Sequence, residues 1–495
     1  MKKINKQTIQ TLINYYKSSD LAKLEKEVKK LLKTFPDEEF LYNILGISFV
    51  ERKKFGKAIS TFKKTLSINP NNAEIFCNIG NTYFAQRKFS QSIKNYQKSL
   101  SIKPDYAEAH YNLGNAYKEK LYFDDAILSY KNAIKYQNDH AEAYSNLGNI
   151  KKYQNNFKDA KKYYQKALKI KPDYSAAYIN LGYLNLSLNN FKEGWEAHEK
   201  RGEALELIKD MGLNNYKLWD GKKFSGSLMI IGEQGLGDYI LFGSMLNDLL
   251  KFHKNITFMI NERLLSLFQR SFPKINFIKF DKNINKYEFD KYILLGSIGR
   301  FLRKTTKDFS KKQIQFIFSD KNKVKKINNE IDINKKLKIG ISWQTESINN
   351  PKERSIKLKQ LLPILKNSNY EFINLQYGDT KKERLELDRK FKIKILNLNS
   401  INYTKDIEEV TAIASQCDLV ITIANFTAQL SSSLGVPTWV ILPYSCHWRW
   451  SVNTEESLWY PTAKIFRQKK WGDWDALIKD VSIKLNDFKK KFYKL

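Results

Sequence analysis

The sequence predicts an α-helical solenoid followed by an α/β domain with parallel sheets. Over the first two-fifths of the chain, small, aromatic and proline residues recur at a constant interval of 34 residues. Beyond residue 225, short apolar runs rich in β-branched residues alternate with helical stretches, a pattern typical of strands that are buried on both faces of a parallel sheet. With 495 residues, the chain has room for two or three domains that each bury a core.

The repeat is defined by three kinds of residue. Glycines keep the interval of 34 at five positions: Gly46, Gly80, Gly114, Gly148 and Gly182. Aromatic residues keep it at four: Phe62, Tyr96, Tyr130 and Tyr164. Small residues are needed where paired helices touch, aromatic residues would fill the space between units, and prolines such as Pro70 and Pro104 end the second helix. The stretch "AEAHYNLGNAYKEKLYFDDAILSYKNAIKYQND" resembles a tetratricopeptide repeat. We expect five clear repeats and a degenerate first one, which together form a surface that binds a protein or peptide partner.

The net charge of +33 comes from lysines spread along the whole chain. Because no arginine-rich block accompanies them, nucleic-acid binding is not favoured, and we expect at most weak attraction to acidic partners or anionic membrane surfaces. The basic N-terminus lacks the apolar core of a secretory signal, and no apolar run has the length of a membrane span. We therefore expect a cytoplasmic protein. Cys77, Cys417 and Cys446 are isolated, so we expect buried packing residues and no metal site.

The change of periodicity sets the expected domain boundaries. The expected parts are a solenoid over 1–200, a capping helix and linker over 201–225, two α/β halves over 226–325 and 337–482, and a helical tail over 483–495. The two halves would meet at the charged stretch 320–337. The expected strands are "LMII", "ITFMI", "INFIKF", "KYILL", "LKIGISW", "EFINLQY", "DLVITI" and "TWVIL". In paired doubly wound domains, ligands bind at the carboxyl ends of the strands.

A glycine-rich turn, "GEQGLGD", follows the first expected strand. Gly232, Gly235 and Gly237 would allow positive φ and a close approach of backbone N–H groups to a bound group. Asp238 would lie at or beside the start of a helix, whose dipole favours an ionised carboxylate. Two interpretations of Asp238 follow from the local sequence: a helix N-cap, or a general base that takes a proton from a sugar hydroxyl.

The stretch "GEQGLGDYI" resembles the N-terminal signature of the family-9 glycosyltransferases, typified by the ADP-heptose:lipopolysaccharide heptosyltransferases. It is similar in particular to bacterial proteins that fuse tetratricopeptide repeats to such a domain. Further stretches agree in order: "LWDGKKFSGSLMI", "FDKYILLGSIGRFLR", "IGISWQTES", "RSIKLKQLLPIL", "NLQYGD", "CDLVITI" and "LPYSCHWRWSVNTEESLWYPTAKIFRQKKWGDWDALI". The resemblance covers roughly residues 215–482. It implies a GT-B architecture, that is, two Rossmann-like halves with the acceptor on the first and the nucleotide-sugar on the second. It also implies Asp238 as the catalytic base and no metal or cofactor besides the nucleotide-sugar.

The second half offers a helix N-terminus for the diphosphate of a donor. The helix would be capped by Asn425, and its first N–H groups and the Thr427 hydroxyl would hold phosphate oxygens. The sequence departs from the family here. Relatives carry an Asp or Ser, an Asn or Thr, and then a His, whereas this chain reads Ala424, Asn425, Phe426, Thr427 and Gln429. Asn425 and Thr427 keep the polar character, and Gln429, a further donor-site candidate, replaces the His and can donate a hydrogen bond but carry no charge. This departure leaves open a different donor, weakened turnover or lost activity.

Six further residues are donor-site candidates because they follow expected strands or lie in the loop behind them: Gln344, Thr345, Lys352, Arg354, Tyr377 and Asp379. For Lys352 and Arg354 a solvated loop is an equal alternative. An aromatic tail could stack a ring or an acceptor: Trp448, Arg449, Trp450, Trp459 and Tyr460. Such a density of aromatic residues, however, favours a core or a domain interface.

Two functions follow from the sequence. The first is a metal-independent transfer of a sugar from a nucleotide-sugar to a glycan or protein acceptor, with the repeats selecting or docking the acceptor. The second is a non-catalytic scaffold whose transferase domain serves for binding. Nucleic-acid binding rests on charge alone. The sequence does not name the sugar, the nucleotide or the acceptor.

Overall fold

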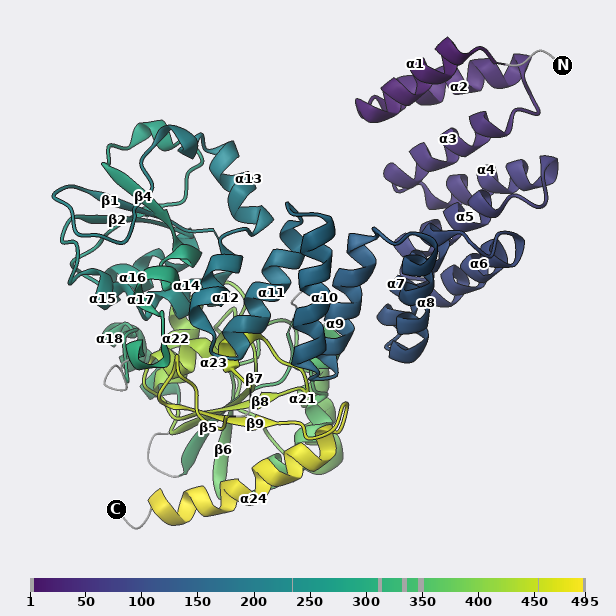
Figure 1. Cartoon of the computed structure of the whole chain (residues 1–495). Coiled ribbons are helices and arrows are strands. Elements are labelled where there is room, and N and C mark those ends of the chain that lie inside the picture. Colours follow the sequence, from purple (N-terminus) through teal and green to yellow (C-terminus); the bar gives the residue numbers. More distant parts are fainter. Residues whose placement is uncertain are drawn as a thin grey trace. The chain divides into compact units, whose positions relative to one another are not determined.

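The computed structural model describes residues 4–233, 235–309, 314–331, 336–345, 351–452 and 454–492, without the side chains of 351–352 and 489–492. The chain divides into two compact units, Met1–Tyr174 and Ser175–Leu495. Helical pairs make up the first unit, and the second contains a further helical pair and two parallel sheets (Figure 1). Among the described helices, none combines the length and apolar character that crossing a membrane requires.

The first unit is a row of paired helices. Their bounds are α1 Lys6–Lys17, α2 Leu21–Thr34, α3 Glu39–Glu51, α4 Phe55–Ile68, α5 Ala73–Ala85, α6 Phe89–Ile102, α7 Ala107–Glu119, α8 Phe123–Tyr136, α9 Ala141–Tyr153 and α10 Phe157–Ile170. The repeated glycines allow the two helices of a pair to meet. A Cβ built at Gly114 would lie 2.7 Å from the ring of Tyr130, and one at Gly148 would lie 2.6 Å from the ring of Tyr164. The expected close approach at the small positions is thus confirmed, whereas these aromatic rings fill the space between the two helices of one unit and not, as expected, the space between units. Helices α1 and α2 form the expected degenerate first repeat.

The second unit begins with one more pair in the same register, α11 Ser175–Ser187 and α12 Phe191–His198. His198 takes the place that Tyr164 has one period earlier. Its backbone lies so close to α11 that a Cβ at Gly182 would be 3.0 Å from the His198 nitrogen. Gly194 makes this approach feasible, because a Cβ there would lie 2.7 Å from Leu186 Cδ2. This helical pair, expected as part of the solenoid over 1–200, therefore belongs to the same compact unit as the two sheets.

The first sheet has the strand order β3-β2-β1-β4, with all strands parallel. The strands are β1 Leu228–Ile231, β2 Ile256–Ile260, β3 Asn276–Lys279 and β4 Lys291–Leu294. The elements that cover it or connect its strands are α13 Gly202–Asp210, η1 Leu213–Asn215, α14 Leu236–Gly243, α15 Leu246–Leu249, η2 Glu262–Leu264, α16 Leu265–Ser271, η3 Ile284–Lys286, η4 Leu295–Ser297, α17 Gly299–Leu302 and η5 Thr306–Asp308. Successive residues of β1 enter two different apolar clusters, so the sheet is buried on both faces, as the apolar runs predict.

The second sheet has the order β6-β5-β7-β8-β9, again parallel. The strands are β5 Leu337–Ser342, β6 Tyr370–Asn374, β7 Leu419–Ile423, β8 Thr438–Leu442 and β9 Ala463–Arg467. Its helices are α19 Pro351–Arg354, η6 Leu358–Leu361, α20 Leu362–Leu365, α21 Lys381–Phe391, α22 Ile407–Ser415, α23 Phe426–Ser433, η7 Trp448–Trp450 and α24 Trp474–Phe492. All eight expected strands form, whereas β9 was missed. The last helix runs without a break through the expected boundary between residues 482 and 483.

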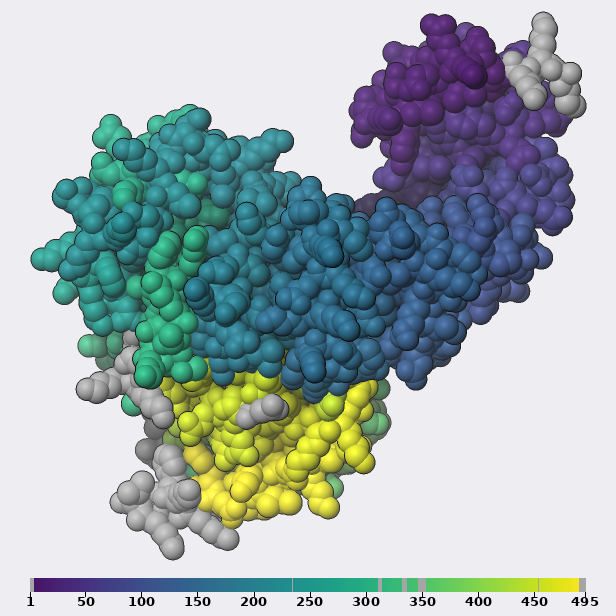
Figure 2. All heavy atoms as spheres, in the orientation of Figure 1, coloured from purple at the N-terminus to yellow at the C-terminus, as the bar shows by residue number. Residues whose placement is uncertain are grey.

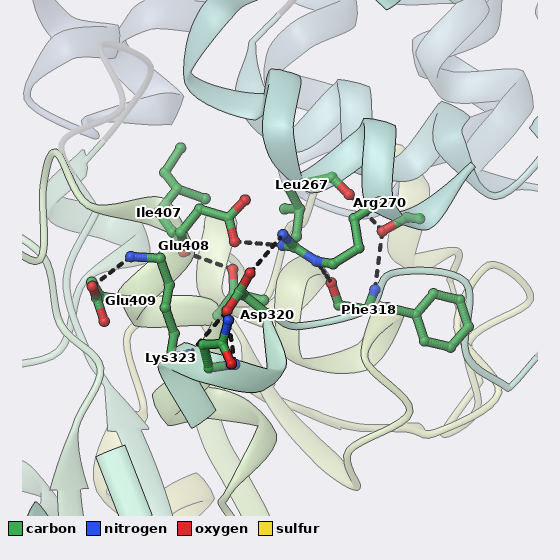
Figure 3. Close-up of polar contacts among 11 residues, drawn as sticks. Leu267, Arg270, Phe318, Asp320, Lys323, Ile407, Glu408 and Glu409 are labelled. Carbon is green, nitrogen blue, oxygen red and sulfur yellow. Dashed lines mark hydrogen bonds and ion pairs between the residues drawn. The ribbon is translucent and has the colours of Figure 1, made fainter. Parts of the chain in front are cut away.

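The two halves are held together beside the segment expected to join them, which contains helix α18 Lys321–Glu330. The Arg270 side chain of the first half forms an ion pair with Glu408 of the second and donates from Nε to the Phe318 carbonyl at 2.8 Å (Figure 3). Lys323 Nζ lies 2.6 Å from Glu409 Oε1. Within the expected joining stretch, residues 320–330 thus contribute a packed helix and charged contacts.

The helix pair α11 and α12 contacts both halves of the α/β part. In Figure 2 the blue-teal atoms from residues near 190 lie against the yellow-green atoms of the C-terminal part of the chain. Trp195 of α12 packs on Gly299 in the first half and donates from Nε1 to the Arg303 carbonyl at 2.7 Å. On the other side, the Val452 N–H donates to the Ser187 carbonyl at 3.0 Å. The helical pair α11 and α12 therefore packs against both halves of the α/β part.

The contact between α12 and α17 gives a stability prediction. A Cβ built at Gly299 would lie 2.4 Å from Cζ2 of Trp195, so Gly299→Ala should lower the free energy of unfolding of the second unit by about 1–3 kcal/mol. Gly202→Ala is the matched control, because its Cβ would meet Ser175 Cβ at an ordinary 3.5 Å. Urea unfolding of the full chain measures both. Equal midpoints for the two variants would contradict the packing.

Candidate functional site

The glycine-rich turn joins β1 to helix α14. Gly235 is the N-cap of α14 and Asp238 is the third residue of the helix, so the N-cap interpretation of Asp238 is wrong. None of the three turn glycines has positive φ, which corrects that expectation as well. Two of them are needed for close packing instead. A Cβ at Gly232 would lie 2.1 Å from the Tyr239 hydroxyl, and one at Gly237 would lie 2.2 Å from Gln429 Nε2.

The Asp238 carboxylate forms an ion pair across the two halves. Its Oδ1 accepts from Arg449 Nη2 at 2.5 Å. The side chains are 22% and 12% exposed, so both are largely withdrawn from water. Arg449 also donates from Nε to Nδ1 of His447 at 3.2 Å. Sequence reasoning assigned no role to His447 and did not pair Arg449 with Asp238, because 211 residues separate the two partners.

Helix α11 contributes an aromatic wall beside this pair. The Tyr183 ring stacks on Trp448, with 6.2 Å between ring centroids, and lies 5.4 Å from the ring of His447. Burial, together with the nearby Asp238 carboxylate, raises the pKa of Tyr183 to about 12. Tyr183 therefore stays protonated over the physiological range.

The aromatic tail is a core and an interface, as the sequence favours. Its rings are almost completely buried: Trp448, Trp450, Trp459 and Tyr460. The expected burial is confirmed for Cys77 and Cys417 and is wrong for Cys446, which is only half-buried. The reason is its position in the loop before η7, where its sulfur accepts from Arg467 Nη1 at 2.7 Å.

The donor-side helix α23 is built as the sequence predicts. Asn425 caps it, with Oδ1 accepting from the Ala428 N–H at 3.3 Å, and Gly435 follows its end with φ +80°. The Asn425 amide also donates to Ser342 Oγ at 2.7 Å, which ties β7 to β5. Thr427 donates its hydroxyl to the Leu375 carbonyl at 3.3 Å and is 2% exposed. Both candidate side chains are thus turned into the protein.

Gln429 is buried in the contact between the halves. It is 3% exposed, its Oε1 accepts from the Tyr460 hydroxyl at 3.3 Å, and its amide nitrogen faces Gly237. Where the resemblance led us to expect a group that touches the donor, Gln429 packs α23 against the start of α14.

A glutamine that sequence reasoning missed organises the loop after β5. Gln376 is 1% exposed, and its Oε1 accepts from Ser342 Oγ at 3.0 Å, from the Trp343 N–H at 2.8 Å and from the Gln344 N–H at 2.7 Å. Gln344 donates from Nε2 to Glu383 Oε1 at 2.9 Å. A polar residue two positions after the end of a buried strand is the signal that could have identified Gln376.

The other candidates lie around the same strand ends. The Thr345 N–H donates to Ser355 Oγ at 3.1 Å, and Arg354 donates from Nη2 to the Ala424 carbonyl at 2.5 Å. Tyr377 is half-buried, whereas Asp379 is exposed and accepts from the Lys381 N–H at 3.0 Å. The side chain of Lys352 lies outside the described residues. The carboxyl ends of β5, β6 and β7 thus bring together most of the candidates predicted for the donor.

A second ion pair, also missed, lies at the other end of the glycine-rich turn. Glu233 forms a two-point contact with Arg201, which includes Nε to Oε2 at 3.1 Å. The two side chains are 3% and 2% exposed. Burial opposes the charge on Arg201, but the adjacent Glu233 and Glu199 carboxylates outweigh it and raise the pKa of the guanidinium. Burial and the Arg201 charge hold the pKa of His198 well below its ordinary value.

Comparison with known proteins identifies the repeats. The family model described as TPR repeat matches residues 46–87 and 80–120, and models described as tetratricopeptide repeat match 107–140 and 141–174. Residues 46–174 are tetratricopeptide repeats. This stretch is the part of the first unit that contains the regular glycine and aromatic positions.

Protein FlbA of Caulobacter vibrioides is a curated relative, 29% identical over 315 residues that cover 60% of this chain and 52% of FlbA. The chain thus spans about half the length of this relative. Because 60% of the chain is more than Met1–Tyr174 contains, the similarity extends into the second unit.

Solved structures similar to the chain include a MamA protein (27% identity, 37% of this chain, 96% of that chain, TM-score 0.28). MamA residues 41 to the end from Desulfovibrio magneticus RS-1 match at 15% identity (34% and 96% of the chains, TM-score 0.31). PilW, described as a widely conserved type IV pilus biogenesis factor, matches at 21% identity (40% and 93%, TM-score 0.36).

Proposed function

We propose that the chain is a docking protein whose tetratricopeptide repeats bind an extended segment of a protein partner. The observation that carries this proposal is a row of asparagines on the first helices of successive repeats. Three of them recur every 34 residues, Asn78, Asn112 and Asn146, and a fourth, Asn43, lies 35 residues before Asn78. All four are half-buried. Each side-chain amide offers one acceptor and one donor group, as a peptide backbone does. A regular row of amides therefore suits an extended chain whatever its side chains are.

Hydrogen bonds between repeats hold these amides in place. Asn78 donates from Nδ2 to Asn43 Oδ1 at 2.9 Å, and Asn146 donates from Nδ2 to Asn115 Oδ1 at 2.9 Å. Asn115 in turn accepts from the Tyr130 hydroxyl at 2.7 Å. An amide that is already oriented loses less conformational entropy when it binds, which favours recognition.

The contacts of the α/β unit also favour docking over catalysis. Asp238 is paired with Arg449, the start of α14 is packed on Gln429, and Asn425 and Thr427 bond to the protein's own atoms. Such contacts suit a unit that holds its two halves together.

Peptide binding tests the proposal directly. A random peptide library is panned against the full chain, and a selected peptide is titrated by calorimetry against variants. Asn112→Ala with Asn146→Ala should weaken binding about tenfold or more, because each lost hydrogen bond contributes roughly 0.5–1.5 kcal/mol. The control pair, Asn71→Ala with Asn138→Ala, changes exposed asparagines between repeats and should bind like the parent. Equal affinities for both pairs, or no selected peptide, would contradict docking through this row.

A second candidate function is glycosyl transfer in a GT-B architecture. Two parallel doubly wound sheets, with a glycine-rich turn after the central strand of one and a capped helix after β7 of the other, support it. Asp238 would take the proton from an acceptor hydroxyl as that oxygen bonds to the anomeric carbon and the diphosphate leaves. Arg449 would first have to release Asp238, and the negative diphosphate is a group that could draw it away.

Thermal unfolding of the full chain with ADP-, UDP-, GDP- and CMP-sugars tests this candidate. A donor present at 100 times its dissociation constant should stabilise the folded protein by about 2.7 kcal/mol. If turnover follows, Asp238→Asn should lower the rate by roughly 10²–10⁴-fold, whereas the exposed control Asp220→Asn should not. The absence of any shift at millimolar nucleotide-sugar would rule out transfer and leave docking untouched.

A further inference from the structure

Arg201 breaks the pattern of the helical repeat at a buried position. One, two, three and four periods earlier, the same position is occupied by a small buried residue: Ala167, Ala133, Ser99 and Thr65. Arg201 is 1% exposed. Burying a guanidinium is strongly unfavourable unless its charge is paired and its N–H groups are bonded. The exchange of a small residue for arginine therefore calls for a set of partners built to receive it.

The side chain has such partners on every side. Nε and Nη2 donate to the two carboxylate oxygens of Glu233, and Nη2 also donates to Ser297 Oγ at 3.1 Å. Nη1 donates to the His198 carbonyl at 3.0 Å and lies 3.4 Å from Glu199 Oε1. One side chain thus connects the end of α12 to two loops of the first sheet.

These two loops follow neighbouring strands. Glu233 comes after β1, and Ser297 comes after β4, which pairs with β1 along its whole length. The order β3-β2-β1-β4 reverses direction between β1 and β4, and doubly wound sheets bind ligands in the crevice at such a point. In this protein the Arg201 guanidinium donates to residues that follow both strands at that point, Glu233 and Ser297. The Arg201 guanidinium thus links the loop after β1 to the loop after β4.

Glu233 lies at the start of the glycine-rich turn that leads to the candidate site at Asp238. Its Oε1 also accepts from the Gly296 N–H at 2.9 Å, so the start of the glycine-rich turn is held from two directions. The same turn ends at Gly235, the cap of α14, and Asp238 follows in the first turn of that helix. A displacement of Glu233 would therefore move the carboxylate that pairs with Arg449.

We infer that Arg201 is a positioning residue, which fixes the glycine-rich turn through Glu233 and thereby holds Asp238 against Arg449. The end of the last helical pair then helps to position the glycine-rich turn of the α/β unit. The inference depends on neither docking nor glycosyl transfer, because it concerns how the turn is held and not what binds there.

Arg201→Lys in the full chain tests the inference, since lysine keeps the charge and loses the two-point contact. Two local readouts are followed: hydrogen exchange of the amides of 235–240, and modification of Arg449 by phenylglyoxal, quantified by mass spectrometry. Both rates should rise at least tenfold. Arg300→Lys is the control, because Arg300 is 47% exposed and lies 3.9 Å from Glu199, and both rates should stay at the parent value. Parent-like rates in Arg201→Lys would overturn the inference.

A second variant covers the case in which Arg201→Lys does not fold. Arg201→Met combined with Glu233→Met replaces the buried pair by apolar side chains, an exchange that proteins often tolerate. It removes the acceptor of the Gly296 N–H, so we expect a folded protein with fast exchange at 235–240 and a reactive Arg449. A folded double variant with parent-like rates would show that packing alone places the turn, and would overturn the inference.

Discussion

The buried ion pair between Arg201 and Glu233 is the contact on which the arrangement of the second unit depends. It joins the end of a helical pair, the glycine-rich turn after β1 and the loop after β4 in one hydrogen-bonded cluster. Replacing one member of a buried pair by an apolar residue typically lowers stability by about 3–5 kcal/mol, because the other charge stays buried without its partner. The cluster therefore fixes where the helical repeats end and where the α/β fold begins.

The division of the chain after Tyr174 places the last helical pair in the same unit as this cluster. The last pair, α11 and α12, keeps the repeat register, but its helices pack on the two halves of the α/β part. Gly194 brings α12 close to α11, His198 replaces the usual tyrosine, and Trp195 packs on Gly299 of the first half. On the opposite side, Tyr183 stacks on Trp448 of the second half. The last repeat thus packs against both halves of the α/β part. The preceding repeats keep the asparagine row that suits a peptide.

Much of this fold could be predicted from the sequence because local patterns determine it. The interval of 34 residues predicted the helix pairs, and apolar runs predicted eight of the nine described strands. Asn425 and Gly435 predicted the two ends of α23. Strand β9 was missed because its sequence, "AKIFR", carries two charges in five residues and lies beside an aromatic tail.

The candidate site was predictable only in its parts. Asp238, Asn425 and the residues after β5 do lie at strand ends and helix starts, but their partners come from distant segments. Arg449 is 211 residues from Asp238, and Glu233 is 32 residues from Arg201. No local pattern pairs such residues. The prediction of positive φ at the turn glycines was wrong for a related reason. These glycines make room for the side chains of Tyr239 and Gln429, and only the folded chain brings those side chains close.

The most direct measurement compares two shortened chains, one starting at Ser175 and one at Gly202, by urea unfolding followed by tryptophan fluorescence. If α11, α12 and Arg201 belong to the α/β unit, the chain from Ser175 should unfold in one cooperative transition at the midpoint that this unit shows in the full chain. The chain from Gly202 should lose that midpoint or fail to fold. Equal midpoints and equal cooperativity for the two chains would contradict the account.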